Sequence, residues 1–147
     1  PILIPTMSIQ SGNTYKLVNV KGGTVIDLSG TDGTSVLGWN DHGGDNQKWV
    51  VEQNLGNQWS FKNVGSGRYL GLGEGHGNGR RLEGVEEPFG WDIFPDEEDS
   101  SVYRINAPGL THFNVDLSDH GNSENGTPIA LWGKWKGTNQ KWRFEEA

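Results

Sequence analysis

Short runs of alternating apolar and polar residues recur along the chain, separated by clusters of glycine and other turn residues. Ile26-Asp27-Leu28 is one such run, and the turn cluster at residues 29–33 follows it. Alternation with a period of two predicts strands with one buried face, and the glycine clusters predict tight turns between them. No segment shows a sustained period of 3.6, so we expect very little helix. The pattern predicts an all-β domain of short strands and hairpins.

The predicted strands fall into three repeats. Tyr15-Lys16-Leu17 begins a stretch that recurs 44 residues later at Trp59-Ser60-Phe61, and 44 residues later again at Tyr103-Arg104-Ile105. Each unit then has an apolar-X-apolar step, at Ile26-Asp27-Leu28, Leu70-Gly71-Leu72 and Val115-Asp116-Leu117. The bulky residues Trp49, Ile93 and Trp142 are interpreted as the ends of the units. Three units of about four strands, at 15–53, 59–98 and 103–147, are expected to pack around a pseudo-threefold axis.

Composition limits the domain organisation and the partners. The 147 residues are enough for one core, and we expect a single domain over residues 8–147. Residues 1–6 are interpreted as a cloning remnant ahead of a natural start at Met7. The lack of cysteine excludes disulfides and favours a cytoplasmic location, and no apolar run is long enough to insert into a membrane. The net charge of −7 disfavours nucleic acid and anionic membranes as partners.

Two of the three units carry the same set of polar and aromatic residues. The first unit has Asp27, Trp39, His42, Asn46 and Gln47, and the third has Asp116, Trp132, Trp135, Asn139 and Gln140. Measured back from the glutamine, the two tryptophans Trp39 and Trp132 match at eight residues, and His42 and Trp135 match at five. The third unit is four residues longer in the turn that precedes its first tryptophan.

These residue types suit the surface of a sugar. An ionised carboxylate accepts hydrogen bonds from two neighbouring hydroxyls, an aromatic ring packs on the apolar C–H face, and an asparagine amide both donates and accepts. The middle unit keeps Leu70 and Leu72 but has Gly71 between them, which indicates that the fold does not require the carboxylate. Gly90-Trp91 also stands where Asn-Gln is expected, so we predict that the middle unit has no working site.

A repeat of about 44 residues with an inner aspartate and a terminal Gln-X-Trp, as at 47–49 and 140–142, resembles the ricin-B-type β-trefoil lectins. The cysteine-free form is similar to the cytoplasmic lectins of mushrooms. The resemblance implies twelve strands, of which six form a barrel and six form hairpins that cap it. It also implies a lectin that binds galactose or N-acetylgalactosamine glycans without metal or cofactor, and a defensive role in a fungus.

The resemblance assigns roles to the matching residues. Asp27 and Asp116 accept hydrogen bonds from sugar hydroxyls, and Asn46 and Asn139 make further contacts. Trp39 or His42 is the aromatic platform of the first unit, Trp132 or Trp135 is that of the third, and Gln47 and Gln140 support the sites. The chain departs from the ricin pattern at Gly38 and Ala130, positions interpreted as those where polar contacts occur in relatives.

Other interpretations of these residues stay open. The two tryptophans Trp39 and Trp132 would also suit strand packing, His42 an exposed loop, and the two asparagines the ends of turns. An enzyme is disfavoured because no two carboxylates are placed to face one another across a cleft, and no nucleophile or zinc motif is present. The main alternative is a protease inhibitor, because similar cysteine-free fungal β-trefoils block proteases with their loops. A homodimer is a further expectation, since pairing would add avidity.

Overall fold

The protein is described from a computed structural model over residues 8–73 and 77–147, so the interpretation of residues 1–6 falls outside the described ranges. The strands are β1 (Thr14–Asn19), β2 (Val25–Leu28), β3 (Val36–Trp39), β4 (Trp49–Gln53), β5 (Trp59–Asn63), β6 (Tyr69–Leu72), β7 (Leu82–Val85), β8 (Asp92–Pro95), β9 (Tyr103–Ala107), β10 (Leu110–Leu117), β11 (Thr127–Gly133) and β12 (Trp142–Glu146). Helix in this part of the chain is confined to the single turns η1 (Asp45–Gln47), α1 (Ser118–Gly121) and η2 (Thr138–Gln140). None of these is long or apolar enough to cross a membrane.

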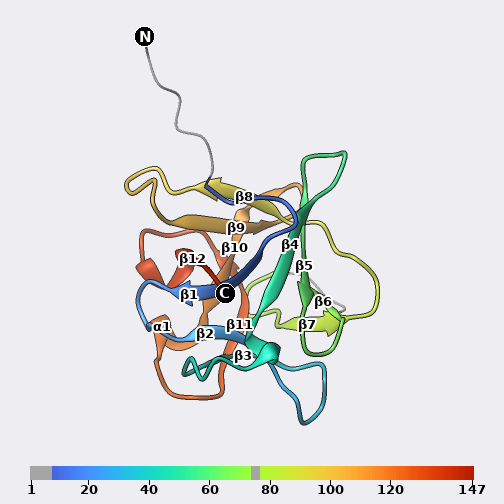
Figure 1. Ribbon diagram of the computed structural model, residues 1–147. Helices are drawn as coiled ribbons and strands as arrows, with labels where there is room; N and C mark the ends of the chain where they lie inside the picture. Colours follow the sequence, from blue (N-terminus) through green and yellow to red (C-terminus); the bar gives the residue numbers. More distant parts are fainter. Residues whose placement is uncertain (1–7, 74–76) are drawn as a thin grey trace.

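Six of the strands pair in a ring and close a barrel, and their course can be followed in Figure 1. Pairing runs around the ring in the order β1, β4, β5, β8, β9 and β12, and β12 returns to β1 over residues 15–19. A single bridge between Trp59 in β5 and Trp91, the residue before β8, closes the ring at this point. The pairs β2–β3, β6–β7 and β10–β11 form three hairpins, which meet through β3–β11 and two further bridges. The arrangement is the β-trefoil expected from the repeats.

Each unit ends on a tryptophan that makes the same two contacts. Its backbone pairs with the opening aromatic residue of the same unit, in the pairs Trp49–Tyr15, Trp91–Trp59 and Trp142–Tyr103. Its indole N–H donates to the carbonyl of the first apolar residue of the inner step, which is Ile26, Leu70 or Val115, at 2.8–3.1 Å. The prediction of Ile93 as the end of the middle unit was therefore wrong. Trp91 closes the middle unit because this unit is two residues shorter than the first unit between its inner step and its closing tryptophan.

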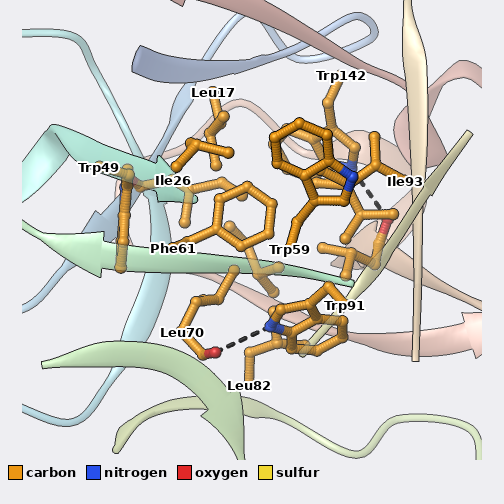
Figure 2. Packing of buried hydrophobic residues seen from close by; sticks show 14 of the residues in the cluster. Leu17, Ile26, Trp49, Trp59, Phe61, Leu70, Leu82, Trp91, Ile93 and Trp142 are labelled. Atoms are coloured by element: carbon orange, nitrogen blue, oxygen red, sulfur yellow. Dashed lines mark hydrogen bonds between the residues drawn. The ribbon is translucent and has the colours of Figure 1, made fainter. Parts of the chain in front are cut away.

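The three closing tryptophans are fully buried and form much of the core with Leu17, Ile26, Phe61 and Leu70. Figure 2 shows Phe61 among these side chains and the hydrogen bond from Trp91 to Leu70. Replacing such a residue by alanine costs about 3–5 kcal/mol, through lost burial and a residual cavity. The core therefore supplies a rigid scaffold that consists of apolar residues and leaves the polar side chains of the hairpins available for other tasks.

Candidate functional site

In the first unit, Gln47 connects the aspartate to the loop that carries the histidine. Its Nε2 donates to Asp27 Oδ2 and to the Asn40 carbonyl, both at 2.9 Å, and its Oε1 accepts from the His42 backbone N–H at 3.0 Å. The His42 Nε2 atom lies 3.8 Å from Asp27 Oδ2. Gln47 thus places an imidazole ring beside a carboxylate and satisfies its own polar atoms while doing so.

The third unit repeats this network around Trp135. Gln140 Nε2 donates to Asp116 Oδ2 and to the Gly133 carbonyl, both at 2.9 Å, and Oε1 accepts from the Trp135 N–H at 3.1 Å. The structure therefore places Trp135 where the first unit has His42, as the spacing predicts. Asp27 and Asp116 are only 4% and 6% exposed, although each alternates along its strand with residues of the apolar core. A carboxylate offers about four lone pairs, so one bond to glutamine leaves it able to accept more.

Each of these rings lies over a glycine three residues before the glutamine. A Cβ at Gly44 would overlap the imidazole of His42, and one at Gly137 would overlap the indole of Trp135. Both glycines have φ values near −70°, which any residue adopts. Glycine is therefore required at these two positions for the space that the ring occupies, and not for an unusual backbone conformation. Sequence reasoning missed both glycines, although their equal spacing from the glutamine was a visible signal.

The other two tryptophans lie farther along the outer strands of the hairpins. Trp39 pairs with Val25, and Trp132 pairs with Asn114, so each is on the same face as the carboxylate of its unit. Trp132 is 48% exposed and Trp135 is 42% exposed, whereas Trp39 is half-buried.

The residues directly opposite the carboxylates are Leu37 in the first unit and Ala130 in the third. The interpretation of Gly38 as the equivalent of Ala130 was wrong, because Gly38 pairs with Ile26 and belongs to the other face.

The two site asparagines hold the strand ends and are themselves held by the next repeat. Asn46 Nδ2 donates to the Leu28 carbonyl at 3.3 Å, and Asn139 Nδ2 donates to the Leu117 carbonyl at 3.1 Å. Their own carbonyls accept from Asn63 and Asn19, respectively, at 2.9 Å. These supporting asparagines lie four residues after the opening aromatic of a unit. The equivalent residue of the third unit, which would support the middle unit, is Ala107. The supporting amide is thus missing where the site residues are missing.

Arg104 ties the third-unit network to a buried carboxylate. Its guanidinium donates to Gln140 Oε1 at 3.1 Å, to the Trp135 carbonyl at 2.8 Å and to Asp96 Oδ1 at 3.0 Å. Lys141 Nζ lies 3.1 Å from the other oxygen of Asp96. Burial would raise the pKa of Asp96, but hydrogen bonds from Lys141, Arg104 and two backbone amides outweigh it and hold the pKa at about 2. In the first unit, the corresponding Lys16 pairs with Asp41 at the surface instead.

Asp116 has the opposite electrostatic balance. Burial raises the pKa of its carboxyl group above the ordinary value, and hydrogen bonds from Gln140 and Asn139 and the charge of His120 offset only part of this. A carboxylate that burial deprives of water is an acceptor ready for ligand hydroxyls, because these would replace the hydration it has lost.

A pocket of about 310 Å³ opens beside Asp116, and its lining includes Trp132, Trp135, Asn139 and the turn at 118–120. Asn139 is buried, and its Oδ1 has no partner among the described residues. The hollow beside His42 has a different character, because it is lined by charged residues and the C-terminal end of the chain, and Asp27 is not part of the lining that the structure describes.

The middle unit has neither the carboxylate nor the amide pair. Pro88-Phe89, and not Gly90-Trp91, stands where Asn-Gln is found in the other units, because Trp91 is the closing tryptophan. Phe89 packs on Trp91 with 4.9 Å between ring centroids. A Cβ at Gly71 would lie 2.5 Å from Val85 Cγ2, so the neighbouring strand fills the space an aspartate would need.

Comparisons with known proteins agree with this architecture. Residues 6–84 and 45–132 match the family described as ricin-type beta-trefoil lectin domain-like. The chain is similar to the ricin B-like lectin of Macrolepiota procera, solved in complex with lactose, with 42% identity and a TM-score of 0.91 over 96% of this chain and 100% of that one. It is also similar to the Rhizoctonia solani agglutinin, with 34% identity and a TM-score of 0.83 over 100% of this chain and 99% of that one.

A designed threefold-symmetric protein has the same fold, with 23% identity and a TM-score of 0.80 over 91% of this chain and 99% of that one. A search of curated proteins found no match. The family match and the two similar lectins agree with the β-trefoil fold. The chain therefore belongs to the ricin-type β-trefoil lectin domain family.

Proposed function

We propose that this lectin binds glycans ending in galactose or N-acetylgalactosamine, through one site around Asp27 and a second around Asp116. The observation that carries the proposal is that the same arrangement is built twice, with a carboxylate, a glutamine and a ring over a glycine. The similar lectin of Macrolepiota procera, whose solved complex contains lactose, a disaccharide with a terminal galactose, supports this sugar class.

Each part of the arrangement has a task toward a sugar ring. The carboxylate accepts from two adjacent hydroxyls, and the neighbouring asparagine takes part through its side-chain amide. The ring of His42 or Trp135 packs against the apolar face of the sugar. Gln47 and Gln140 make no contact with the sugar in this proposal, but they fix the carboxylate and the loop of the ring relative to one another.

The proposed binding uses no metal ion and no catalysis. Within residues 8–73 and 77–147, no three His, Asp or Glu side chains are grouped closely enough to hold a metal ion. A single shallow sugar site of this kind is expected to bind with a dissociation constant of about 1 mM, near −4 kcal/mol. Two sites on one chain, or a homodimer, would raise the avidity toward a surface with many glycan ends.

The test is binding to an array of glycans, with lactose as the competitor and with EDTA present. We expect retention on galactose-terminated and N-acetylgalactosamine-terminated glycans, release by lactose and no effect of EDTA. The double variant Asp27→Asn/Asp116→Asn should lose this binding and keep its melting temperature within a few degrees. Equal binding by the double variant would refute the proposed sites. Tight inhibition of a protease by a chain that binds no glycan would favour the inhibitor function instead.

We also infer a defensive role, in which the lectin is eaten and binds glycans in the gut of the animal. Its support is the sugar class proposed above and the similarity to fungal lectins. Feeding the protein and its double variant to nematodes tests this role, since toxicity of the protein alone is expected and equal toxicity of both would contradict it. The cytoplasmic location and the homodimer stay predictions.

A further inference from the structure

The two sites differ at three places, and all three differences meet at the pocket beside Asp116. The first is the four-residue extension of the third unit. It forms the turn α1, in which Asp119 and His120 both have φ of 53°, and residues 118–120 line the pocket. A left-handed backbone at two successive non-glycine residues is uncommon, which indicates that the surroundings hold this turn in place.

The second difference is the residue opposite the carboxylate. Ala130 pairs with Asp116, whereas the longer Leu37 pairs with Asp27. Directly opposite residues of an antiparallel pair have neighbouring side chains on one face of the sheet. Alanine therefore leaves space beside Asp116 that leucine fills beside Asp27. Trp132 lies two residues beyond Ala130 on the same face, about 7 Å along the strand, and its exposed indole lines the same pocket as Asp116.

The third difference is the ring in the loop that the glutamine holds beside the carboxylate. Trp135 replaces His42, and His120 from the extended turn packs edge-on against it, with 5.9 Å between centroids and 78° between planes. The pocket consequently has two indoles, Trp135 next to Gln140 and Trp132 along the strand, with Asp116 and Asn139 in the same lining.

We infer that the third-unit pocket holds two linked sugar rings, whereas the first-unit site holds one. The terminal ring binds Asp116 and Asn139 and packs on Trp135. The ring that precedes it in the glycan passes over Ala130 and packs on Trp132. In the first unit, Leu37 blocks this path to Trp39. The inference rests on the proposed function and extends it from a terminal sugar to a disaccharide.

The experiment compares lactose with methyl β-galactoside by calorimetric titration. In the variant Asp27→Asn, which leaves only the third-unit site, lactose is expected to bind about tenfold more tightly, the gain from packing one further ring face on an indole. In the matched variant Asp116→Asn, which leaves the first-unit site, the ratio of the two affinities is expected to be near one. A ratio near one in both variants would overturn the inference while leaving the proposed function intact. No binding of either sugar to the Asp27→Asn variant would instead remove the proposed third-unit site itself.

Two further substitutions in the Asp27→Asn chain locate the second ring. Trp132→Ala removes the exposed indole, and Ala130→Leu introduces the residue of the first unit. Each is expected to reduce the ratio of lactose to galactoside affinity from about ten to about one. Trp39→Ala in the Asp116→Asn chain is the matched control, and its ratio should stay near one. If the ratio stays near ten in both third-unit variants, the second ring does not lie over Ala130 and Trp132.

Discussion

Replacing Asp116 by asparagine separates the binding role of the carboxylate from any structural role. Asparagine has nearly the same shape and keeps one oxygen that can accept from Gln140, so the 2.9 Å hydrogen bond has a replacement partner. What it removes is the charge. Burial already raises the pKa of Asp116, which means that the ionised carboxylate is disfavoured in the folded protein. The substitution is therefore expected to change the free energy of unfolding by less than about 1 kcal/mol.

The loss of binding follows from the hydrogen bonds to the sugar. A hydrogen bond to a charged group contributes about 1.5–3 kcal/mol, and one between neutral groups about 0.5–1.5 kcal/mol. Two hydroxyls on Asp116 would thus lose about 2 kcal/mol together, which is a decrease in affinity of roughly 30-fold. The assay is titration with lactose in the Asp27→Asn background, with thermal unfolding measured on the same samples. Asp92→Asn, in β8 of the middle unit, is the control for the change in net charge.

Two results would refute this reasoning. An affinity for lactose within about threefold of the parent variant would show that the carboxylate does not hold the sugar. A loss of about 3 kcal/mol or more in the free energy of unfolding would show that Asp116 is structural, because an apolar core residue of this fold would cost about as much.

Further predictions concern the surroundings of the two sites. Gly137→Ala should displace the ring of Trp135 and weaken lactose binding about tenfold in titrations of the Asp27→Asn chain, with a change of less than about 1 kcal/mol in unfolding free energy. Lactose affinity of the same chain should fall with decreasing pH from a point above about 3.9, where an exposed aspartate titrates, because the pKa of Asp116 is raised. Asp96→Asn should destabilise the fold by about 3 kcal/mol in denaturant titrations, since it leaves two buried cations unpaired. The lowered pKa of Asp96, about 2, contributes about 2 kcal/mol to the free energy of unfolding above pH 4. Unfolding measured as a function of pH should show the loss of this contribution between pH 4 and 2. Asn63→Ala should weaken the first-unit site and leave the third unchanged, when each is titrated alone.

Much of the architecture could be predicted from the sequence because each unit repeats its apolar positions. The opening aromatics at intervals of 44 residues and the inner apolar steps gave three units of four strands, and the structure confirms the β-trefoil. The end of the middle unit was placed wrongly because the same interval was applied to it. Turn lengths vary between units, so Trp91 precedes the expected position by two residues. The indole bond to Leu70 identifies it, and only the folded chain shows that bond.

The candidate sites could be predicted in part for a related reason. Aspartate and the Asn-Gln pair stand at the ends of strands, where spacing within one unit is enough to place them together. The support from Asn63 and Asn19 comes from other units, and no spacing within a unit reveals it. The exchange of Leu37 for Ala130 was missed because Gly38 was taken as the equivalent residue, although Leu37 and Ala130 both lie ten residues before the glutamine of their unit.

The most direct test of the central claim is a crystal structure of the lectin grown with lactose and EDTA. The account predicts a galactose ring in both sites, with its hydroxyls on the carboxylates of Asp27 and Asp116 and its C–H face on His42 and Trp135. Lactose bound elsewhere on the protein, with both carboxylates free of sugar, would contradict it.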